Sequence, residues 1–393
     1  MKPSTQSLRW LPLSIFSCLL FFALIIVYSP QHIRNNAASA LQQAAPAVKT
    51  VVSIATVTAT ATRTATVEKT LPSKPAYTSG EPVPGYEYSK GIIVASVKKE
   101  NTSWVADRLP DFARYIYVND DPEAEFTVPK NHGNELMAYL TFIIDHYDKL
   151  PEIMFFVHAH ERTFHNPAIF DYSTPNQIKA INLDRVVREG YMNINCGDWD
   201  TGKCPAYIRP SDQEPGIAHL HAFRELFPEY HMPQILGAAC CSQFAVTKER
   251  MLQIPLEKWN RYRDWLLKTE EGDPGYIWEY VWQFLLKGEL VHCPAAQVCY
   301  CDGYHICFGG HHPFEDYMAL ERSKETMIGN ARALDKQEEE AKEAGRTLSQ
   351  YDVERRVRMR DMIKDLDEEI ARRREAAWER GKDPELRAME KDL

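Results

Sequence analysis

The sequence predicts an α/β fold in which helices cover both faces of a mostly parallel sheet. Residues 91–97, 115–120 and 152–160 are short apolar segments typical of buried strands, and segments with helical spacing separate them. Successive parallel strands need a crossover connection, which is usually a helix. We therefore expect one folded domain over residues 88–314, built on a sheet of this kind.

The helix between the second and third strands is the best defined of these connections. From Asn134 onward, apolar residues recur at intervals of three and one: Leu136, Tyr139, Leu140, Ile143, Ile144 and Tyr147. Such spacing gives the helix one apolar face that can cover a sheet, and Pro151 marks its end. Further along, residues 235–251 fit a buried strand followed by a short helix, and aromatic helices flank a turn at 272–275.

The N-terminal region predicts a membrane anchor. Residues 11–28 contain no charged side chain and are long enough to cross a thin bilayer core. Lys2 and Arg9 precede this span, which favours a single-pass type II arrangement with a cytosolic tail at 1–10 and the folded domain in the lumen of the Golgi or endoplasmic reticulum. A cleaved signal peptide is the alternative, because residues 38–40 resemble a small-residue cleavage site.

Segments of biased composition flank the predicted domain. Residues 29–87 are rich in Ala, Thr and Pro and are predicted to form a disordered stalk whose threonines suit O-glycosylation. Residues 315–393 combine strong helix formers with opposite charges spaced three and four apart, which predicts one or two exposed helices. No heptad is sustained there, so a coiled-coil dimer is not expected and the oligomeric state stays open. The net charge of −9 argues against nucleic acid as the main partner.

The cysteines predict disulfide bonds. Eight of the nine lie in the folded domain: Cys196, Cys204, Cys240, Cys241, Cys293, Cys299, Cys301 and Cys307. An even set of this kind suits an oxidising compartment, whereas a zinc site is the alternative for the last four. The sequence leaves the pairing open. A short-range bond between Cys196 and Cys204 is one option, and the adjacent Cys240 and Cys241 are expected to have different partners.

The densest group of chemically versatile side chains follows the third predicted strand. His158 and His160 are candidate metal ligands there, and His165 is a candidate catalytic residue. Imidazoles two residues apart on an extended chain point to opposite faces, so both can bind one metal ion only if the loop curls back. The alternative is that these histidines hydrogen-bond loop carbonyls.

Two further candidate sites follow the second strand. Asp120 and Asp121 could hold a ribose hydroxyl or a divalent cation, and Asp121 is the candidate catalytic carboxylate of the pair; an ordinary turn is the alternative. Lys130 and Asn131 precede the long helix, where backbone N–H groups can receive a phosphate, although a simple capping loop explains them equally well.

Two isolated residues complete the candidates. Glu279 lies in an aromatic helix and could serve as a general base facing a sugar, or as the ion-pair partner of Arg261 or Arg263. Asn101 begins the one N-x-S/T sequon of the chain. If its loop faces a ligand, we expect glycosylation at Asn101 to be absent.

Several segments resemble a known family. Residues 91–309 contain VASVKKENTSWV, VNDDP, FFVHAHERTFHN, CCSQFAVTKERM and WEYVWQF. Together, and in this order, they are similar to the family catalogued as domain of unknown function 3431, which is widespread in fungi.

More distant relatives carry a YNED-like sequence after the first strand, which resembles the opening of GT-A glycosyltransferases. This resemblance implies a GT-A-like, Rossmann-like fold whose first loop meets a nucleotide, and it places Glu100 in that loop. The sequence departs from the pattern at Lys98 and Lys99, which replace the aromatic–Asn pair, and no D-x-D motif follows the third strand.

The resemblance and the predicted layout together imply a secretory-pathway glycosyltransferase. It would use a nucleotide-sugar donor, a glycan or small-molecule acceptor, and a divalent metal ion, Mn or Mg rather than Zn. Asp120, Asp121 and either His158 or His160 would contact the sugar nucleotide or its metal. A non-catalytic lumenal accessory protein of the same fold is one alternative, favoured by the missing D-x-D motif. A metal-dependent hydrolase built on the histidines is the other.

Overall fold

The computed structural model describes residues 72, 74–197, 204, 208–209, 216–270 and 272–390 of the chain. All of them belong to one compact unit, Lys69–Leu393. The predicted membrane span at 11–28, and the stalk up to residue 71, lie outside the described residues. Among the helices of the described residues, none is both long and apolar enough to cross a bilayer.

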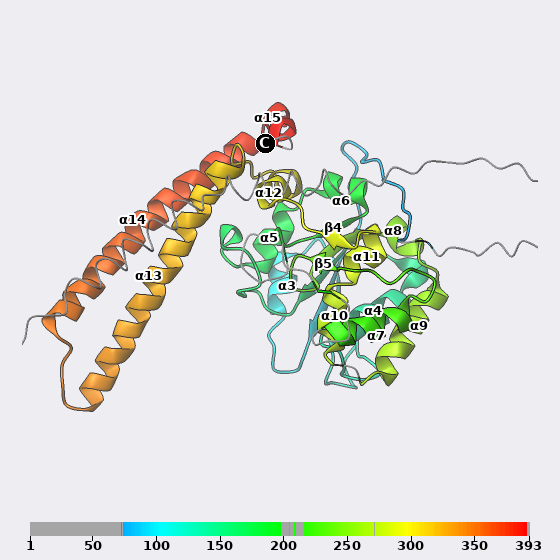
Figure 1. Ribbon diagram of the computed structural model, residues 1–393, viewed down its shortest axis with the longest axis horizontal. Coiled ribbons are helices and arrows are strands. Elements are labelled where there is room, and N and C mark those ends of the chain that lie inside the picture. Colours follow the sequence, from blue (N-terminus) through cyan, green and yellow to red (C-terminus); the bar gives the residue numbers. More distant parts are fainter. Residues whose placement is uncertain are drawn as a thin grey trace, which may run out of the picture. The chain divides into compact units, whose positions relative to one another are not determined.

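The elements alternate along the first half of the domain and become mainly helical in the second half (Figure 1). The strands are β1 (Lys90–Ser96), β2 (Ala113–Val118), β3 (Ile153–His158), β4 (Tyr191–Asn193), β5 (Gly237–Ala238), β6 (Phe244–Thr247) and β7 (Val291–His292). The helices of the domain are α3 (Ser103–Arg108), α4 (Leu136–Asp145), α5 (Thr174–Ala180), α6 (Leu183–Glu189), α7 (Gly216–Leu226), α8 (Lys248–Leu252), α9 (Leu256–Lys268), α10 (Pro274–Glu279), α11 (Trp282–Lys287) and α12 (Ala296–Tyr304). Three more helices follow, α13 (His311–Glu343), α14 (Gln350–Gly381) and α15 (Pro384–Glu390).

The central sheet has the strand order β2-β1-β3-β6-β4. β1 pairs in parallel with β2 and with β3, whereas β6 is antiparallel to both of its neighbours. Four of the five strands therefore run in the same direction, which confirms the mostly parallel sheet predicted from the sequence. The three predicted strands correspond to β1, β2 and β3, with ends that differ by no more than two residues.

Helices cover both faces of this sheet. Side chains along a strand alternate between its two faces, and here they divide between two hydrophobic clusters. Ile93 of β1 and Phe156 of β3 join a cluster with residues of α4, α7, α9 and α11. Ile92 and Phe155 join a second cluster with residues of α3, α6 and α12. The prediction of helices on both faces is confirmed.

Helix α4 begins two residues later than the sequence suggested. Gly133 and Asn134 have φ angles of +71° and +55°, which are left-handed values that cannot start a right-handed helix. The first helical residue is therefore Leu136. Ala138 and Thr141 are buried along with the predicted apolar face, because α9 packs against α4 as well as the sheet.

Residues 74–88, called the N-terminal strap below, pack on the folded domain. The buried guanidinium of Arg250 on α8 donates to the backbone oxygens of Thr78 at 3.0 Å and Leu286 at 2.8 Å. It also lies 4.3 Å from the ring centroid of Tyr77. Contacts with the domain therefore begin before residue 88, the boundary expected from the sequence.

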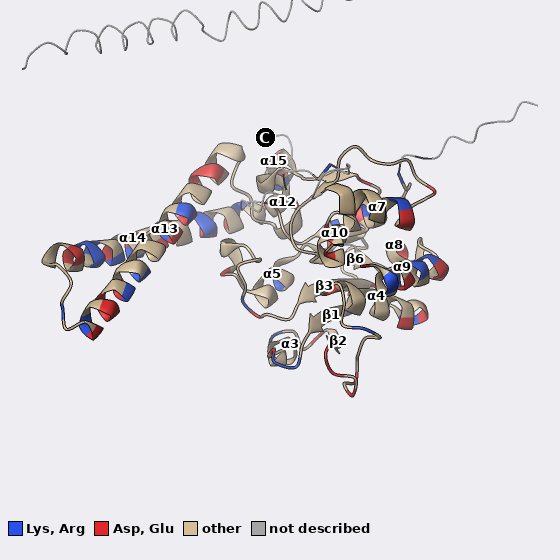
Figure 2. Cartoon of the chain, turned by 60° about the horizontal axis from the view of Figure 1, so that its bottom comes forward, with Lys and Arg blue, Asp and Glu red and all other residues tan. Residues whose placement is uncertain are grey.

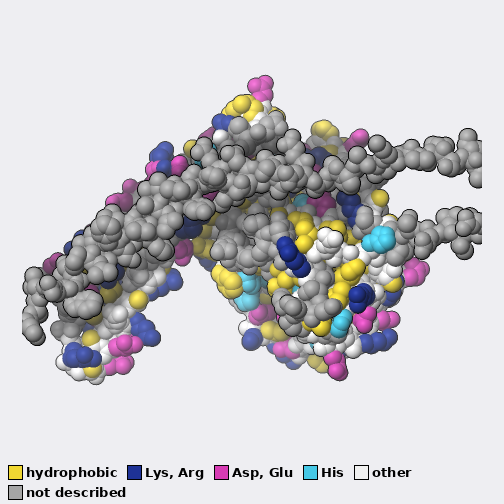
Figure 3. Space-filling model, viewed as in Figure 1, with side chains coloured by type: hydrophobic (Ala, Val, Ile, Leu, Met, Phe, Trp, Pro, Cys, Tyr) yellow, Lys and Arg dark blue, Asp and Glu magenta, His cyan; other side chains and the backbone are white. Residues whose placement is uncertain are grey.

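The C-terminal region forms an antiparallel helical hairpin of α13 and α14. Lys324 pairs with Asp367 in one part of the hairpin and Arg356 pairs with Asp335 nearer its tip. Acidic and basic residues are interspersed along the two helices (Figure 2). Where grey atoms do not cover the hairpin in Figure 3, its surface shows both acidic and basic side chains. The predicted charged helices are present in the structure.

This hairpin is attached to the domain rather than only solvated. The ring of Phe314 lies 5.8 Å from that of Tyr300, and the ring of Tyr317 lies 4.9 Å from that of Phe308. Helix α15 returns to the same place and inserts the buried carboxylate of Glu390. The base of the hairpin is therefore part of the hydrophobic cluster on one face of the sheet.

The predicted disulfides are present, but the expectation for Cys240 and Cys241 is wrong, and Cys196 does not form the short-range bond that was one option. The bonds are Cys196–Cys299, Cys204–Cys293, Cys240–Cys241 and Cys301–Cys307. Cys196 bonds to Cys299 rather than to Cys204, because β4 and α12 pack in the same buried cluster although they are far apart in sequence. Cys240 and Cys241 bond to each other at a tight turn in which Cys241 has a φ angle of +94°.

Candidate functional site

A cleft of about 620 Å³ opens at the carboxyl ends of the first three strands. The chain places β2 on one side of β1 and β3 on the other, so its progress across the sheet reverses there. Open α/β sheets bind ligands at such a switch point, because the loops on its two sides diverge and leave a crevice. The lining of this cleft comes from the loops after β1, β2 and β3 and from the residues before α4.

Five of the predicted site residues come together in this lining. These residues are Glu100, Asn131, His158, His160 and His165. They belong to the segments that follow β1 and β2, to the end of β3 and to the segment after it. Glu100 is fixed by its own loop, because its carboxylate accepts the N–H of Val97 at 2.9 Å. The sequon residue Asn101 follows directly, and its side-chain oxygen accepts the N–H of Ser103 at 3.0 Å.

The cleft holds two histidine–glutamate pairs. His158 Nε2 lies 3.9 Å from Glu135 Oε2, with side chains that are 17% and 13% exposed. His160 Nε2 lies 3.4 Å from Glu100 Oε1 in a more open position. The ring of His165 stands edge-on to that of His158, with centroids 5.3 Å apart. A carboxylate beside an imidazole stabilises the protonated ring, so each pair suits a proton acceptor.

Three predicted residues after the second strand, Asp120, Asp121 and Lys130, are not among those that line the cleft. Asp120 accepts the backbone N–H of Lys98 at 2.7 Å, and the carboxylate of Asp121 lies 3.2 Å from the Lys98 ammonium. The two aspartates thus tie the loop after β2 to the loop after β1. Lys130 donates instead to the carbonyl oxygen of Leu267 at 3.4 Å.

Glu279 lies at the end of α10 and is not among the residues that line the cleft. Its carboxylate accepts the backbone N–H of Cys241 at 3.2 Å. The ion pairs of Arg261 and Arg263 are with Glu229 and Asp145, so neither arginine is the partner that the sequence suggested for Glu279.

Sequence reasoning missed Glu135 and Asn119, which complete the cleft. Glu135 reaches it because the left-handed residues Gly133 and Asn134 turn the chain just before α4. Asn119 donates to the carbonyl oxygen of Asn134 at 3.0 Å. Its buried Oδ1 atom has no hydrogen-bond partner within the described part of the chain. A buried acceptor of this kind is destabilising unless a donor meets it, so it favours a ligand that carries one. The one sequence signal for this turn was the Gly-Asn pair.

The arrangement does not fit a metal held by the predicted ligands. His158 and His160 face different carboxylates, Glu135 and Glu100. Nowhere in the described ranges do three or more His, Cys, Asp or Glu side chains gather in a way that could hold a metal ion. The described residues therefore do not show His158 and His160 gathered as ligands of one metal ion.

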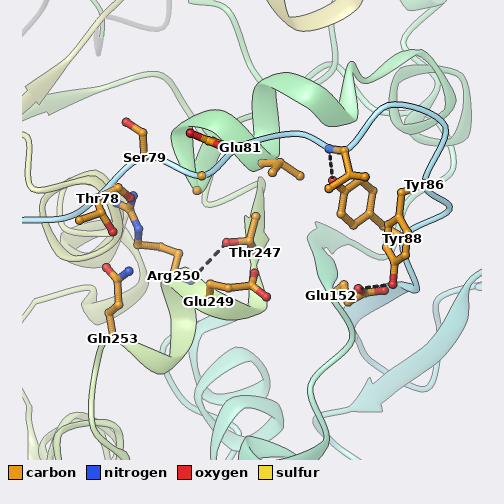
Figure 4. A pocket seen from close by; sticks show the side chains of 14 residues that line it. Thr78, Ser79, Glu81, Tyr86, Tyr88, Glu152, Thr247, Glu249, Arg250 and Gln253 are labelled. Carbon is orange, nitrogen blue, oxygen red and sulfur yellow. Dashed lines mark hydrogen bonds between the residues drawn. The ribbon is translucent and has the colours of Figure 1, made fainter.

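A second cavity, of about 420 Å³, lies under the N-terminal strap (Figure 4). Glu152, one of the lining residues, accepts the Ser89 N–H at 2.8 Å and the Tyr86 hydroxyl at 2.9 Å. Both hydrogen bonds lower the pKa of Glu152, and the one from the Ser89 N–H has the larger effect. The polar groups that line this cavity bind the strap, and this explains their presence structurally. The cleft is therefore the better candidate site.

Comparison with known proteins finds one family. A family model described as "Protein of unknown function (DUF3431)" matches residues 92–302, which is more than half of the chain. The matched region runs from β1 to α12 and so contains the whole of the cleft. Neither the curated proteins nor the solved structures gave a match.

Proposed function

This chain belongs to the family described as "Protein of unknown function (DUF3431)", and we propose that its cleft is the active site of a glycosyltransferase with a nucleotide-sugar donor. The observation that carries the proposal is the position of the cleft at the switch point between β1 and β3, where open α/β sheets bind nucleotides. The resemblance of more distant relatives to the opening of GT-A glycosyltransferases, from which this chain departs at Lys98 and Lys99, suggests the same donor class.

The compartment proposed for this activity is the lumen of the secretory pathway. Disulfides persist in oxidising compartments and are rare in the cytosol. The bonds of the domain, three of which involve the segment 293–307, agree with a lumenal domain. The apolar segment at 11–28 would anchor it as a single-pass type II membrane protein.

In the proposed reaction His158 is the general base. It takes the proton of the acceptor hydroxyl while that oxygen bonds to the anomeric carbon of the donor, and the bond from this carbon to the diphosphate breaks. Glu135 lies 3.9 Å away and stabilises the imidazolium that forms. The products are the glycosylated acceptor and a nucleoside diphosphate.

Two further groups would orient the donor. Asn119 Oδ1 is a buried acceptor suited to a hydroxyl or amide donor of the nucleotide sugar. Arg162, also in the lining, supplies a guanidinium for the diphosphate, whose charge grows as the bond to the sugar breaks. Glu100 with His160 occupies the side of the cleft next to the first loop.

Binding of the donor is tested first, by a thermal-shift screen of the purified full-length chain. The ligands are uridine, guanosine and adenosine diphosphates and their sugar conjugates, with and without manganese. A ligand at a hundred times its Kd should raise the unfolding free energy by about 2.7 kcal/mol. Selective stabilisation by one nucleotide supports the proposal and identifies the donor class. No shift with any of them, in folded protein, would leave the accessory-protein alternative.

Catalysis is tested by the release of nucleoside diphosphate from the donor so identified. His158→Asn should lower kcat by roughly 10²-fold or more while the thermal shift with the nucleotide persists. His312→Asn, at an exposed histidine at the start of α13, is the matched control and should leave turnover unchanged. Equal turnover in the two variants would exclude His158 as the base.

A further inference from the structure

A third cavity, of about 670 Å³, lies between the loop after β3 and the part of α13 from Met318 to Arg332. Phe164, Pro167 and Tyr172 supply one wall, and Met318, Glu321 and Glu325 supply the other. Its volume is in the range of pockets that hold small-molecule ligands, roughly 300–1,000 Å³. Since α13 begins after the region that the family model matches, the second wall belongs to the C-terminal part of the chain.

Phe164 joins this cavity to the cleft, because its side chain lines both. It is 71% exposed, which is unusual for a large aromatic residue, while its ring lies 4.1 Å from that of His165. A ring that is held by a neighbour and still faces solvent is a flat apolar platform. A ligand stacked on Phe164 would therefore reach from the cavity toward the histidines of the cleft.

The opposite wall offers carboxylates that are already oriented. Glu321 is only 5% exposed and accepts the Tyr317 hydroxyl at 2.7 Å. Glu325 accepts the Tyr172 hydroxyl, also at 2.7 Å. Each of these contacts uses Oε1, and a carboxylate can accept several hydrogen bonds at its two oxygens. The hydroxyl partners hold both groups as acceptors for donors from a ligand.

The charges of the cavity balance, which favours a neutral ligand. Arg322 and Arg332 line it together with Glu321 and Glu325. Arg322 is also 3.4 Å from Glu315 outside the lining, so its charge is partly satisfied within α13. An anionic ligand would meet two carboxylates, and a cationic one two guanidinium groups.

We propose that this cavity is the acceptor site and that it binds a neutral saccharide. A sugar ring presents an apolar C–H face to Phe164 and hydroxyl donors to Glu321 and Glu325, which is the combination that the two walls provide. The assignment rests on the glycosyl transfer proposed above. Phe164 would direct one hydroxyl of the bound saccharide to His158, which takes its proton as the oxygen attacks the donor.

The test uses the full-length chain on an array of immobilised neutral oligosaccharides, followed by titration of the best free saccharide. Phe164→Ala and Glu325→Gln should each weaken its binding at least tenfold. The glutamine keeps an acceptor for Tyr172, so the fold should be retained. Tyr351→Ala and Glu339→Gln, both at exposed positions of the hairpin, are the matched controls and should leave the affinity unchanged.

The same preparation separates the two proposals. Glu325 does not line the cleft, so Glu325→Gln should leave the thermal shift with the nucleotide unchanged while it weakens the saccharide. Nucleotide binding without binding of any saccharide, or saccharide binding that neither variant weakens, would overturn the assignment of the cavity. Saccharide binding that both variants weaken, without any nucleotide binding, would support the saccharide site and overturn the transferase proposal.

Discussion

The carboxylate of Glu390 accepts the backbone N–H of Gly309 at 2.9 Å, although the two residues are 81 positions apart in the chain. It also accepts the N–H of Gly310 at 2.8 Å. Both glycines have positive φ angles, +87° and +116°, which turn their N–H groups at the start of α13. One side chain of α15 thus holds the point where the hairpin leaves the domain.

Removing this carboxylate should loosen the base of the hairpin. We expect Glu390→Ala to lower the unfolding free energy by roughly 2 kcal/mol, because hydrogen bonds to charged groups contribute about 1.5–3 kcal/mol. Urea unfolding of the Lys69–Leu393 unit measures the loss, and hydrogen exchange should speed up at Gly309 and Gly310. Glu385→Ala, in the exposed part of α15, is the control. Equal midpoints for the two variants would contradict the role of Glu390.

Arg250 should hold the N-terminal strap through its geometry as well as its charge. Its guanidinium donates to the backbone carbonyl oxygens of Thr78, Glu189 and Leu286. A lysine ammonium cannot reproduce the planar arrangement of these N–H donors. Arg250→Ala leaves the three carbonyl groups without this donor and should destabilise the domain by about 3 kcal/mol. Arg250→Lys should recover only part of the loss. Limited proteolysis should cut the strap faster in both variants than in Arg224→Ala, an exposed arginine of α7.

Stability should fall in acid through Glu152. The pKa of this carboxyl is lowered from 4.5 in the folded protein, chiefly by the Ser89 N–H, so the folded state binds its proton less readily than the unfolded state. Its contribution is therefore fully present above pH 4.5 and is lost as the pH falls through the folded-state pKa. Thermal unfolding from pH 7 to 3 should show a shallower acid decline for Glu152→Gln. If the unfolding temperatures of the variant and the parent fall equally with decreasing pH, Glu152 does not contribute to the acid dependence of stability.

Two of the disulfides should differ in their contribution to stability. Cys196 and Cys299 are 103 residues apart, whereas Cys301 and Cys307 are six apart. By loop-closure entropy the first bond contributes up to about 4.7 kcal/mol and the second about 2 kcal/mol. Cys196→Ala with Cys299→Ala should therefore lower the urea midpoint more than Cys301→Ala with Cys307→Ala. The reverse order would show that strain or unfolded-state structure outweighs the entropy of the loop.

The parts of the fold that could be predicted from the sequence are those encoded locally. β1 and β3 are continuous apolar runs, and the face of α4 repeats with helical spacing, so each is visible within one window. The antiparallel direction of β6 was not accessible, because it depends on the path of the chain between β3 and β4. β4 is only three residues long, and no periodicity can reveal it.

The site divides in the same way. His158, His160 and His165 are close in sequence and were found together, as was Glu100 through the resemblance of its loop. Glu135 could not be paired with His158 from sequence, since their contact requires the start of α4 to lie beside the end of β3. The bond between Cys196 and Cys299 was missed for the same reason, because only the packed sheet brings β4 and α12 together.

Helix α12 also gives the molecule a path for mechanical load. Cys299 connects it to the segment after β4, and two residues later Cys301 connects it to Cys307, just before the hairpin. A pull on the hairpin would pass from Cys307 through two covalent bridges into the sheet, and the residues between Cys301 and Cys307 would carry no tension. The two bridges thus give the base of the hairpin a covalent connection to the segment after β4 that bypasses residues 302–306.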